Sequence, residues 1–246
     1  MRRLFLALIL LLSASGAQAA VAFDAKGTAD CTSPTTATVT CSTLTIGTGG
    51  SNYVLVAYVS YANNSLPTSV TATWNGTSMT RIGTLQYSST LSIGTAVFCL
   101  PAPTSGNHPL VITVNGTIAS PEVHTIGASF TGADQTTPCK NSTTLTDFSG
   151  TTGTLTVTSA TGDIATASWT QNFTTINTMS GTIIVTDDSG PNTGMYANYA
   201  PGAATVALTA TANGTASWQG TGVDIAAAGG GGGGSPTFRT MTGVGK

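Results

Sequence analysis

Charged residues are what this chain lacks most. Only 7% of its 246 residues are Asp, Glu, Lys or Arg, whereas about a quarter are charged in an average soluble domain. Histidine occurs twice, and Glu122 is the single glutamate. Acid/base catalysis needs titratable groups whose pKa values are shifted by their neighbours. This shortage argues against an enzyme and makes a secreted hydrolase the least favoured function.

Clusters of basic residues are also missing. Once a leader carrying Arg2 and Arg3 is removed, five basic residues remain against nine acidic ones, a net charge of −4. No two of the five are neighbours in the sequence. Neutralising nucleic-acid phosphates requires a basic patch. We therefore expect no nucleic-acid partner.

Long apolar runs are absent except at the start. Arg2 and Arg3 precede an apolar run over residues 4–12, and Ala17 and Ala19 lie where signal peptidase reads small side chains. This pattern predicts a signal peptide over residues 1–20. A membrane-spanning helix needs about 20 apolar residues, and the later run at 53–61 is too short. We expect a secreted or cell-surface protein with no transmembrane segment in its mature part.

Helical spacing is missing as well, and strand patterns take its place. Residues 53–59 (YVLVAYV) are apolar on both faces, as in a central strand covered on each side, whereas residues 110–114 and 154–158 alternate. Thr and Val, which favour strands, dominate. The pattern predicts an all-β domain over residues 21–228: a single antiparallel β-sandwich, jelly-roll or Ig-like, of about ten to twelve strands.

Turns and a linker divide the chain further. Asn-Gly pairs begin at Asn75, Asn115 and Asn213, and each predicts a hairpin because both residues tolerate positive φ. Residues 229–234 are all glycine and predict a flexible linker. The tail over 235–246 is either a disordered end or a peptide for a partner, in which Phe238 and its neighbour Arg239 would make the contact.

Four cysteines allow three pairings. Export places Cys31, Cys41, Cys99 and Cys139 in an oxidising space, so we expect two disulfides. Cys31 with Cys41 is favoured because these two flank one Thr-rich turn. Cys99 with Cys139 is favoured because this bond could join a strand to a nearby loop. The spacings do not match a zinc site.

Candidate catalytic residues are few. Glu122 and His124 are two positions apart and would share one face of a strand, as an acid/base pair could. A glycosidase needs two carboxylates, so we interpret this pair as exposed and non-catalytic. Asp134, followed by Gln135 and two threonines, predicts a turn capped by side-chain hydrogen bonds.

The segment over residues 187–199 is the preferred ligand site. Asp187, Asp188 and Asn192 gather oxygen atoms that could bind Ca²⁺, although the closing Glu of a calcium loop is missing. Tyr196 and Tyr199 follow in a turn-rich stretch and could stack on a sugar. The alternative is a long loop packed by its own aromatic rings. The three tryptophans lie in strand-like runs and are expected in the core: Trp74, Trp169 and Trp218.

Taken in order, several segments resemble a β-sandwich module of large secreted bacterial surface proteins of adhesin-like or unassigned character. The resemblance covers most of residues 43–228, and FTGADQTTP at 130–138 is its most specific part. It implies a sandwich exposed outside the cell and transfers no catalytic residue. The chain departs from the module at Cys99 and Cys139, where apolar residues are expected, and at the glycine run, where a further module would follow.

Three hypotheses follow for the function. The first is a non-enzymatic structural subunit that self-assembles or forms part of a cell surface. The second is a glycan-binding adhesin module, and the third is a secreted hydrolase. We expect no cofactor apart from the calcium considered at residues 187–192.

Overall fold

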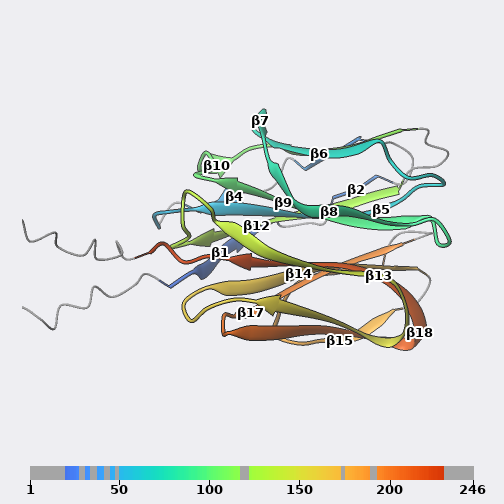
Figure 1. The fold of residues 1–246 in the computed structure, drawn as a ribbon. Coiled ribbons are helices and arrows are strands. Elements are labelled where there is room, and N and C mark those ends of the chain that lie inside the picture. Colours follow the sequence, from blue (N-terminus) through green and yellow to red (C-terminus); the bar gives the residue numbers. More distant parts are fainter. Residues whose placement is uncertain are drawn as a thin grey trace, which may run out of the picture.

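The computed structural model describes residues 20–27, 31–33, 38–41, 45–47, 50–116, 122–172, 175–188 and 193–229. The regular structure of these residues consists of eighteen strands, more than the ten to twelve predicted, and the strands pair antiparallel throughout (Figure 1). The predicted all-β fold of antiparallel sheets is confirmed, and the arrangement of several sheets is consistent with a sandwich. In this part of the chain no helix is long and apolar enough to cross a membrane.

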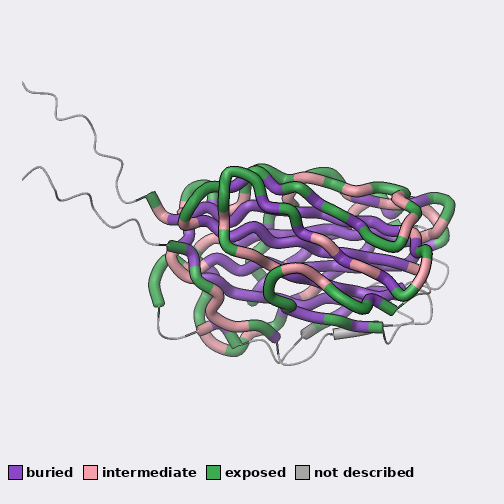
Figure 2. Tube along the Cα trace, turned by 90° about the horizontal axis from the view of Figure 1, so that it is seen from below, coloured by how far each residue is buried: buried purple, intermediate pink, exposed green. Residues whose placement is uncertain are grey.

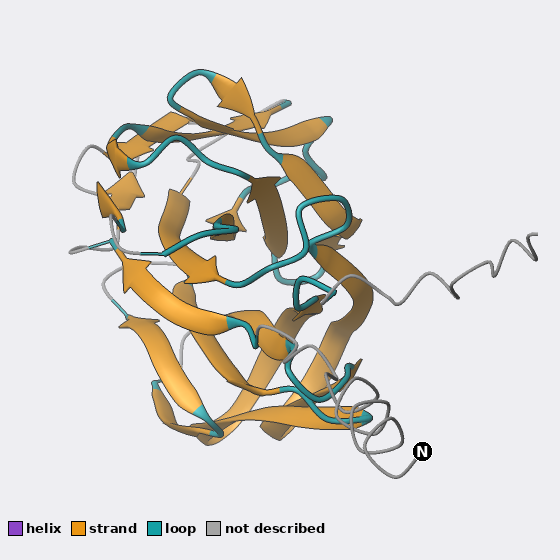
Figure 3. Cartoon of the chain, turned by 90° about the vertical axis from the view of Figure 1, so that its left-hand side faces the viewer, coloured by secondary structure: helices purple, strands orange, loops and turns teal. Residues whose placement is uncertain are grey.

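The sheets stack in three layers, as a view along the strands shows (Figure 3). The central sheet has the order β1 (Ala22–Lys26), β12 (Glu122–Thr131), β5 (Val54–Ala62), β9 (Ile93–Pro101) and β8 (Thr80–Ser88), and β2 (Cys31–Ser33) also pairs with β12. The upper sheet has the order β3 (Thr38–Cys41), β11 (Leu110–Asn115), β6 (Ser69–Trp74) and β7 (Thr77–Ser78). A short pair joins β4 (Thr45–Ile46) to β10 (Gly106–Asn107).

The lower sheet has the order β13 (Cys139–Thr158), β18 (Thr205–Ile225), β14 (Ile164–Asn172), β17 (Gly194–Pro201) and β16 (Thr182–Asp187), and β15 (Ile176–Met179) also pairs with β18. Strands β13 and β18 contain 20 and 21 residues. The ladder between them shifts register three times. Since bulges bend a strand and increase its twist, the sheet curves around a core of its own that includes Trp169, Trp218 and Leu208.

Strand β5 explains why the central sheet is covered on both faces. All nine of its residues are buried. Leu55, Val59 and Tyr61 pack into the core under the upper sheet, whereas Val56 and Tyr58 pack into the core over the lower sheet. The doubly apolar run at 53–59 therefore correctly predicted a central strand. Figure 2 shows buried residues running along the middle of the strands, with exposed residues gathered at loops and ends.

The three Asn-Gly pairs have different structures. Asn75 and Gly76 have φ of 47° and 76° and form a two-residue turn that pairs Trp74 with Thr77, as predicted. Asn115 ends β11, and residues 117–121, which follow, lie outside the described part. The hairpin predicted at Asn213 is wrong, because β18 continues through this position. Residues 212–215 form a bulge without partners on β13, between Thr211, which pairs with Thr152, and Ala216, which pairs with Gly150, so the strand continues instead of turning back.

Threonines line the outward faces of both outer sheets. On β13 and β18, Thr152 is paired with Thr211, Thr154 with Thr209 and Thr158 with Thr205, while Leu155 and Leu208 point inward. We call these six residues the lower threonine face. On the upper sheet, Thr113 is paired with Thr38 on one side and Thr71 on the other. These three residues are the upper threonine face.

Candidate functional site

Three of the residues singled out from the sequence meet inside the molecule. Glu122 and His124 lie on β12 and share a face, as predicted, and β16 brings Asp187 to the same place. The sequence prediction that Glu122 and His124 are exposed is wrong, because both side chains are completely buried. The lower sheet covers the face of β12 that carries them. We call these three residues the buried charged triad.

The triad is held by two short hydrogen bonds. His124 Nδ1 lies 2.5 Å from Asp187 Oδ2, and His124 Nε2 lies 2.7 Å from Glu122 Oε1. Burial alone would lower the pKa of His124, but the hydrogen bonds and charges of Asp187 and Glu122 outweigh it and raise the pKa to about 9. The ring is therefore an imidazolium at neutral pH and donates both N–H groups.

A row of hydroxyl groups continues from the triad across the interface between the central and lower sheets. Ser60 is the strand partner of both His124 and Thr95. Thr170 Oγ1 donates to Ser60 Oγ at 2.8 Å, and Thr95 Oγ1 and Ser168 Oγ are 2.9 Å apart. This half of the interface is polar, whereas the other half is the apolar core around Val56. No pattern in the sequence predicted this row, because single Ser and Thr residues are common on strands.

The triad is unsuited to acid/base or nucleophilic chemistry. A general base needs a free nitrogen lone pair, and both ring nitrogens of His124 are engaged with carboxylates. A substrate would also need access, yet the side chains of the triad are at most 2% exposed. Two surface depressions are lined by other residues. One of about 240 Å³ lies beside Ile82 and Pro138, and one of about 420 Å³ lies beside Tyr53 and Gln135.

The predicted ligand segment is not a loop over its whole length. Tyr196 lies on β17 and is completely buried, and its hydroxyl accepts a hydrogen bond from Gln171. Tyr199 is half-buried and stacks on Phe23 with ring centroids 5.4 Å apart. The expectation of exposed tyrosines is therefore wrong, because β17 lies between β14 and β16. Its apolar residues Met195 and Ala197 could have signalled a strand.

The predicted calcium ligands also differ in their exposure to solvent. Asp187 is buried and bonded to His124, whereas Asp188 is exposed. Asn192 lies outside the described residues. The described part of the chain contains no group of three or more His, Cys, Asp and Glu residues arranged to hold a metal ion.

The three tryptophans are core residues, as predicted. Each is completely buried. Trp74 donates its indole N–H to Thr104 O, Trp169 to Asn198 Oδ1 and Trp218 to Gly150 O. A buried indole needs such a partner for its N–H. They are therefore unavailable to stack on a sugar.

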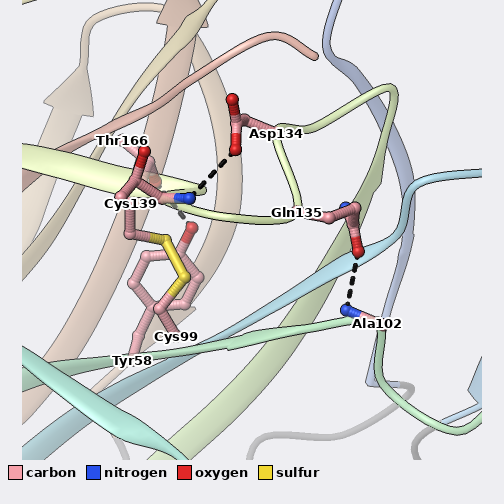
Figure 4. The surroundings of a disulfide bond; sticks show 8 residues. Tyr58, Cys99, Ala102, Asp134, Gln135, Cys139 and Thr166 are labelled. Atoms are coloured by element: carbon pink, nitrogen blue, oxygen red, sulfur yellow. Dashed lines mark hydrogen bonds between the residues drawn. A yellow bond between two sulfur atoms is a disulfide. The ribbon is translucent and has the colours of Figure 1, made fainter.

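The Cys99–Cys139 disulfide is present and links β9 of the central sheet to β13 of the lower sheet (Figure 4). It closes a separation of 40 residues, which the chain-entropy estimate values at about 4 kcal/mol. Cys31 and Cys41 lie on the described strands β2 and β3. Their side chains, and so their predicted pairing, lie outside the described part.

Beside this disulfide, Asp134 caps the turn predicted for it. Its Oδ1 accepts hydrogen bonds from the backbone N–H groups of Thr136 and Thr137 at 2.7 and 2.9 Å. These two bonds lower the pKa of Asp134. Gln135 Oε1 accepts from Ala102 N and connects the turn to the end of β9 (Figure 4). The FTGADQTTP segment therefore has a structural role at this end of the molecule.

The remaining predicted sites cannot be placed. The signal peptide lies outside the described residues except for Ala20, and the same holds for the glycine linker beyond Gly229 and for Phe238 and Arg239 in the tail. Comparison of the chain with known protein families, curated proteins and solved structures found no match.

Proposed function

We propose that this chain is a secreted, non-enzymatic subunit of an extracellular structural or surface assembly. The observation that carries the proposal is the pair of threonine faces on the outer sheets. Thr152 Oγ1 and Thr211 Oγ1 lie 3.1 Å apart, and Thr38 Oγ1 lies 3.4 Å from Thr113 Oγ1. Outward-facing hydroxyl rows without charge can pack against a second copy, since each hydroxyl is both a donor and an acceptor.

Low charge supports association. A net charge far from zero keeps copies of a protein apart by repulsion, and without its predicted leader this chain has a net charge of only −4, from five basic and nine acidic residues. Few large apolar side chains are exposed in the described part of the chain. Among the described residues, the large hydrophobic side chains that are exposed are Leu66 and Ile183. Contacts through threonine faces would therefore be specific and polar rather than a nonspecific hydrophobic aggregation.

The buried charged triad supports a non-enzymatic role. In the described part of the chain, His124 is the completely buried histidine, and it lies between two carboxylates. The site is closed to solvent, and both ring nitrogens of His124 are engaged. Export is supported by the predicted signal peptide and by the Cys99–Cys139 bond, since disulfides persist in oxidising compartments. A glycan-binding module is less well supported, because Tyr196 and the tryptophans are buried.

Light scattering and electron microscopy of the purified mature protein test the proposal. We expect assemblies above a threshold concentration. The double variant Thr154→Lys with Thr71→Lys places one charge on each threonine face and should shift the protein to monomers. Thr90→Lys with Thr104→Lys adds the same two charges at exposed positions outside the strands and is the matched control.

Two results would contradict the proposal. One is a protein that stays monomeric at every concentration tested, and the other is assembly that the double variant does not weaken. Turnover of a polysaccharide or ester by the wild type, lost in Glu122→Gln, would favour the hydrolase instead.

A further inference from the structure

A second group of buried charges lies where the chain enters and leaves the fold. Asp224 on β18 is the strand partner of Lys140 on β13. Asp163, in the turn before β14, accepts a hydrogen bond from Ala227 N at 2.7 Å through Oδ1. The neighbouring Gly162 O accepts from Val21 N. The group therefore ties together the first and last described segments.

The two carboxyl groups are deeply buried but incompletely satisfied. The side chains of Asp163 and Asp224 are 5% and 0% exposed. Asp224 Oδ1 accepts from Ser159 Oγ at 2.6 Å, but Asp163 Oδ2 has no hydrogen-bond partner. Burial raises the pKa of Asp224 to about 6; the charge of Asp163 and a hydrogen bond between the two carboxyl groups add to this shift, and the bond from Ser159 and the charge of Lys140 oppose it. The site holds more negative charge than its surroundings compensate.

Lys140 is a weak counter-ion for this pair. Its Nζ lies 3.5 Å from Asp163 Oδ2 and 3.7 Å from Asp224 Oδ2, and its side chain is 43% exposed. It stands beyond ideal hydrogen-bond distance of both oxygens and can turn into solvent without leaving a buried donor unpaired. A cation that displaced it would interact with both carboxylates.

We propose that Asp163 and Asp224 form a binding site for a divalent cation of the calcium type, with Lys140 as its competitor. Asp163 Oδ2 and Asp224 Oδ2 supply two carboxylate ligands. Asn141, whose amide nitrogen lies 3.5 Å from Asp224 Oδ2, can present its amide oxygen after rotation of the side chain. Water completes the six to eight oxygen ligands that Ca²⁺ takes.

Calcium is favoured over magnesium by the mixed ligand set. Mg²⁺ requires a near-ideal octahedron at short distance, whereas Ca²⁺ accepts irregular geometry. Two carboxylates place the affinity in the weak range of about 10⁻⁴ to 10⁻³ M found for extracellular modules. Binding would strengthen the contact between the turn at Asp163 and the end of β18. The bound form should therefore unfold at higher temperature.

Thermal unfolding of the mature protein, after dialysis against a chelator, tests the proposal. We expect millimolar CaCl₂ to raise the unfolding midpoint, and MgCl₂ or NaCl of equal ionic strength to raise it less. Lys140→Gln removes the competitor and should bind Ca²⁺ at least several-fold more tightly by isothermal titration calorimetry. Asp163→Asn should lose the calcium effect. Asp188→Asn makes the same charge change at an exposed position and should keep it.

The outcomes separate the alternatives. If neither the wild type nor Lys140→Gln responds to Ca²⁺, Lys140 and a shared proton alone neutralise the pair and the proposal fails. It also fails if Asp163→Asn retains the response. If Asp188→Asn abolishes the response, the cation binds near residue 188. Should Asp163→Asn not fold, the comparison of Lys140→Gln with wild type still decides, because only cation binding makes removal of a positive charge increase the calcium effect.

Discussion

At the scale of single residues, His124 is the side chain on which the buried interface depends most. Its two N–H groups donate hydrogen bonds to two buried carboxylates, those of Asp187 and Glu122. Breaking a buried ion pair by removing one partner leaves an uncompensated charge. The triad therefore holds the central and lower sheets in register through directed bonds, where an apolar contact would be less specific.

His124→Gln should be strongly destabilising for this reason. The variant removes the positive charge that bonds to both Glu122 and Asp187, and we expect a loss of about 3 to 5 kcal/mol in the free energy of unfolding. Urea denaturation measures it. His108, the other histidine, is half-buried, bonds to Ser105 O and packs edge-to-face against Trp74, so His108→Gln should cost less than about 2 kcal/mol. Equal losses in the two variants would show that the triad has no special role.

The same histidine predicts how stability depends on pH. Its pKa rises from 6.5 in the unfolded chain to about 9 in the folded protein, so the folded state binds more protons between these values. The contribution of His124 to the free energy of unfolding is complete below pH 6.5 and is lost as the pH rises towards 9. Urea denaturation from pH 6 to 9.5 should show wild-type stability falling across this window. His124→Gln should have a flatter profile, and a wild type whose stability rises there would contradict the assignment.

At the scale of strands, local signals were reliable where tertiary contacts agreed with them. The apolar run at 53–59 predicted a strand covered on both faces, and Asn75 with Gly76 predicted a tight turn; both are confirmed. The same dipeptide at Asn213 lies inside β18. There, the residues on either side pair with distant strands, Ala212 with Ile176 and Ser217 with Asn172, and the chain runs between them without the positive φ of a tight turn. Such long-range pairing cannot be inferred from a dipeptide.

Two glycine substitutions distinguish the turn at Gly76 from the strand position at Gly214. A Cβ at Gly76 or at Gly214 would meet no atom within 4 Å, but only Gly76 has positive φ, at +76°. Gly76→Ala should therefore destabilise by about 1 to 2 kcal/mol through backbone strain. Gly214→Ala should be neutral or slightly stabilising, since alanine loses less conformational entropy. Chemical denaturation of both variants is the measurement, and a reversed order would place the turn at Asn213 after all.

At the scale of the whole molecule, the structure shows burial and strand pairing that could not be predicted from the composition. The sequence predicted the fold class and the Cys99–Cys139 bond, because strand periodicity and cysteine counts are visible in one dimension. It predicted Glu122 and His124 on one face but not their burial, since the covering strand β16 lies 63 positions from His124 at Asp187. It also placed Tyr196 in a loop, because the Gly and Pro residues nearby hid a strand that pairs with β16, just before it in the sequence, and with β14.

The tail prediction belongs to this scale as well. The described fold closes by Ala227 and Ala228, whose N–H groups donate to Asp163 Oδ1 and Gly132 O. A linker of six glycines gives a root-mean-square reach of roughly 12 to 15 Å, enough for the segment with Phe238 to contact a neighbouring copy. Deleting residues 235–246 should then leave the thermal midpoint within about 1 °C of wild type, since the tail lies beyond the residues that form the described cores. Assemblies seen by light scattering should weaken or disappear. If the truncated chain assembles as the full chain does, the threonine faces alone mediate association and Phe238 has no part in it.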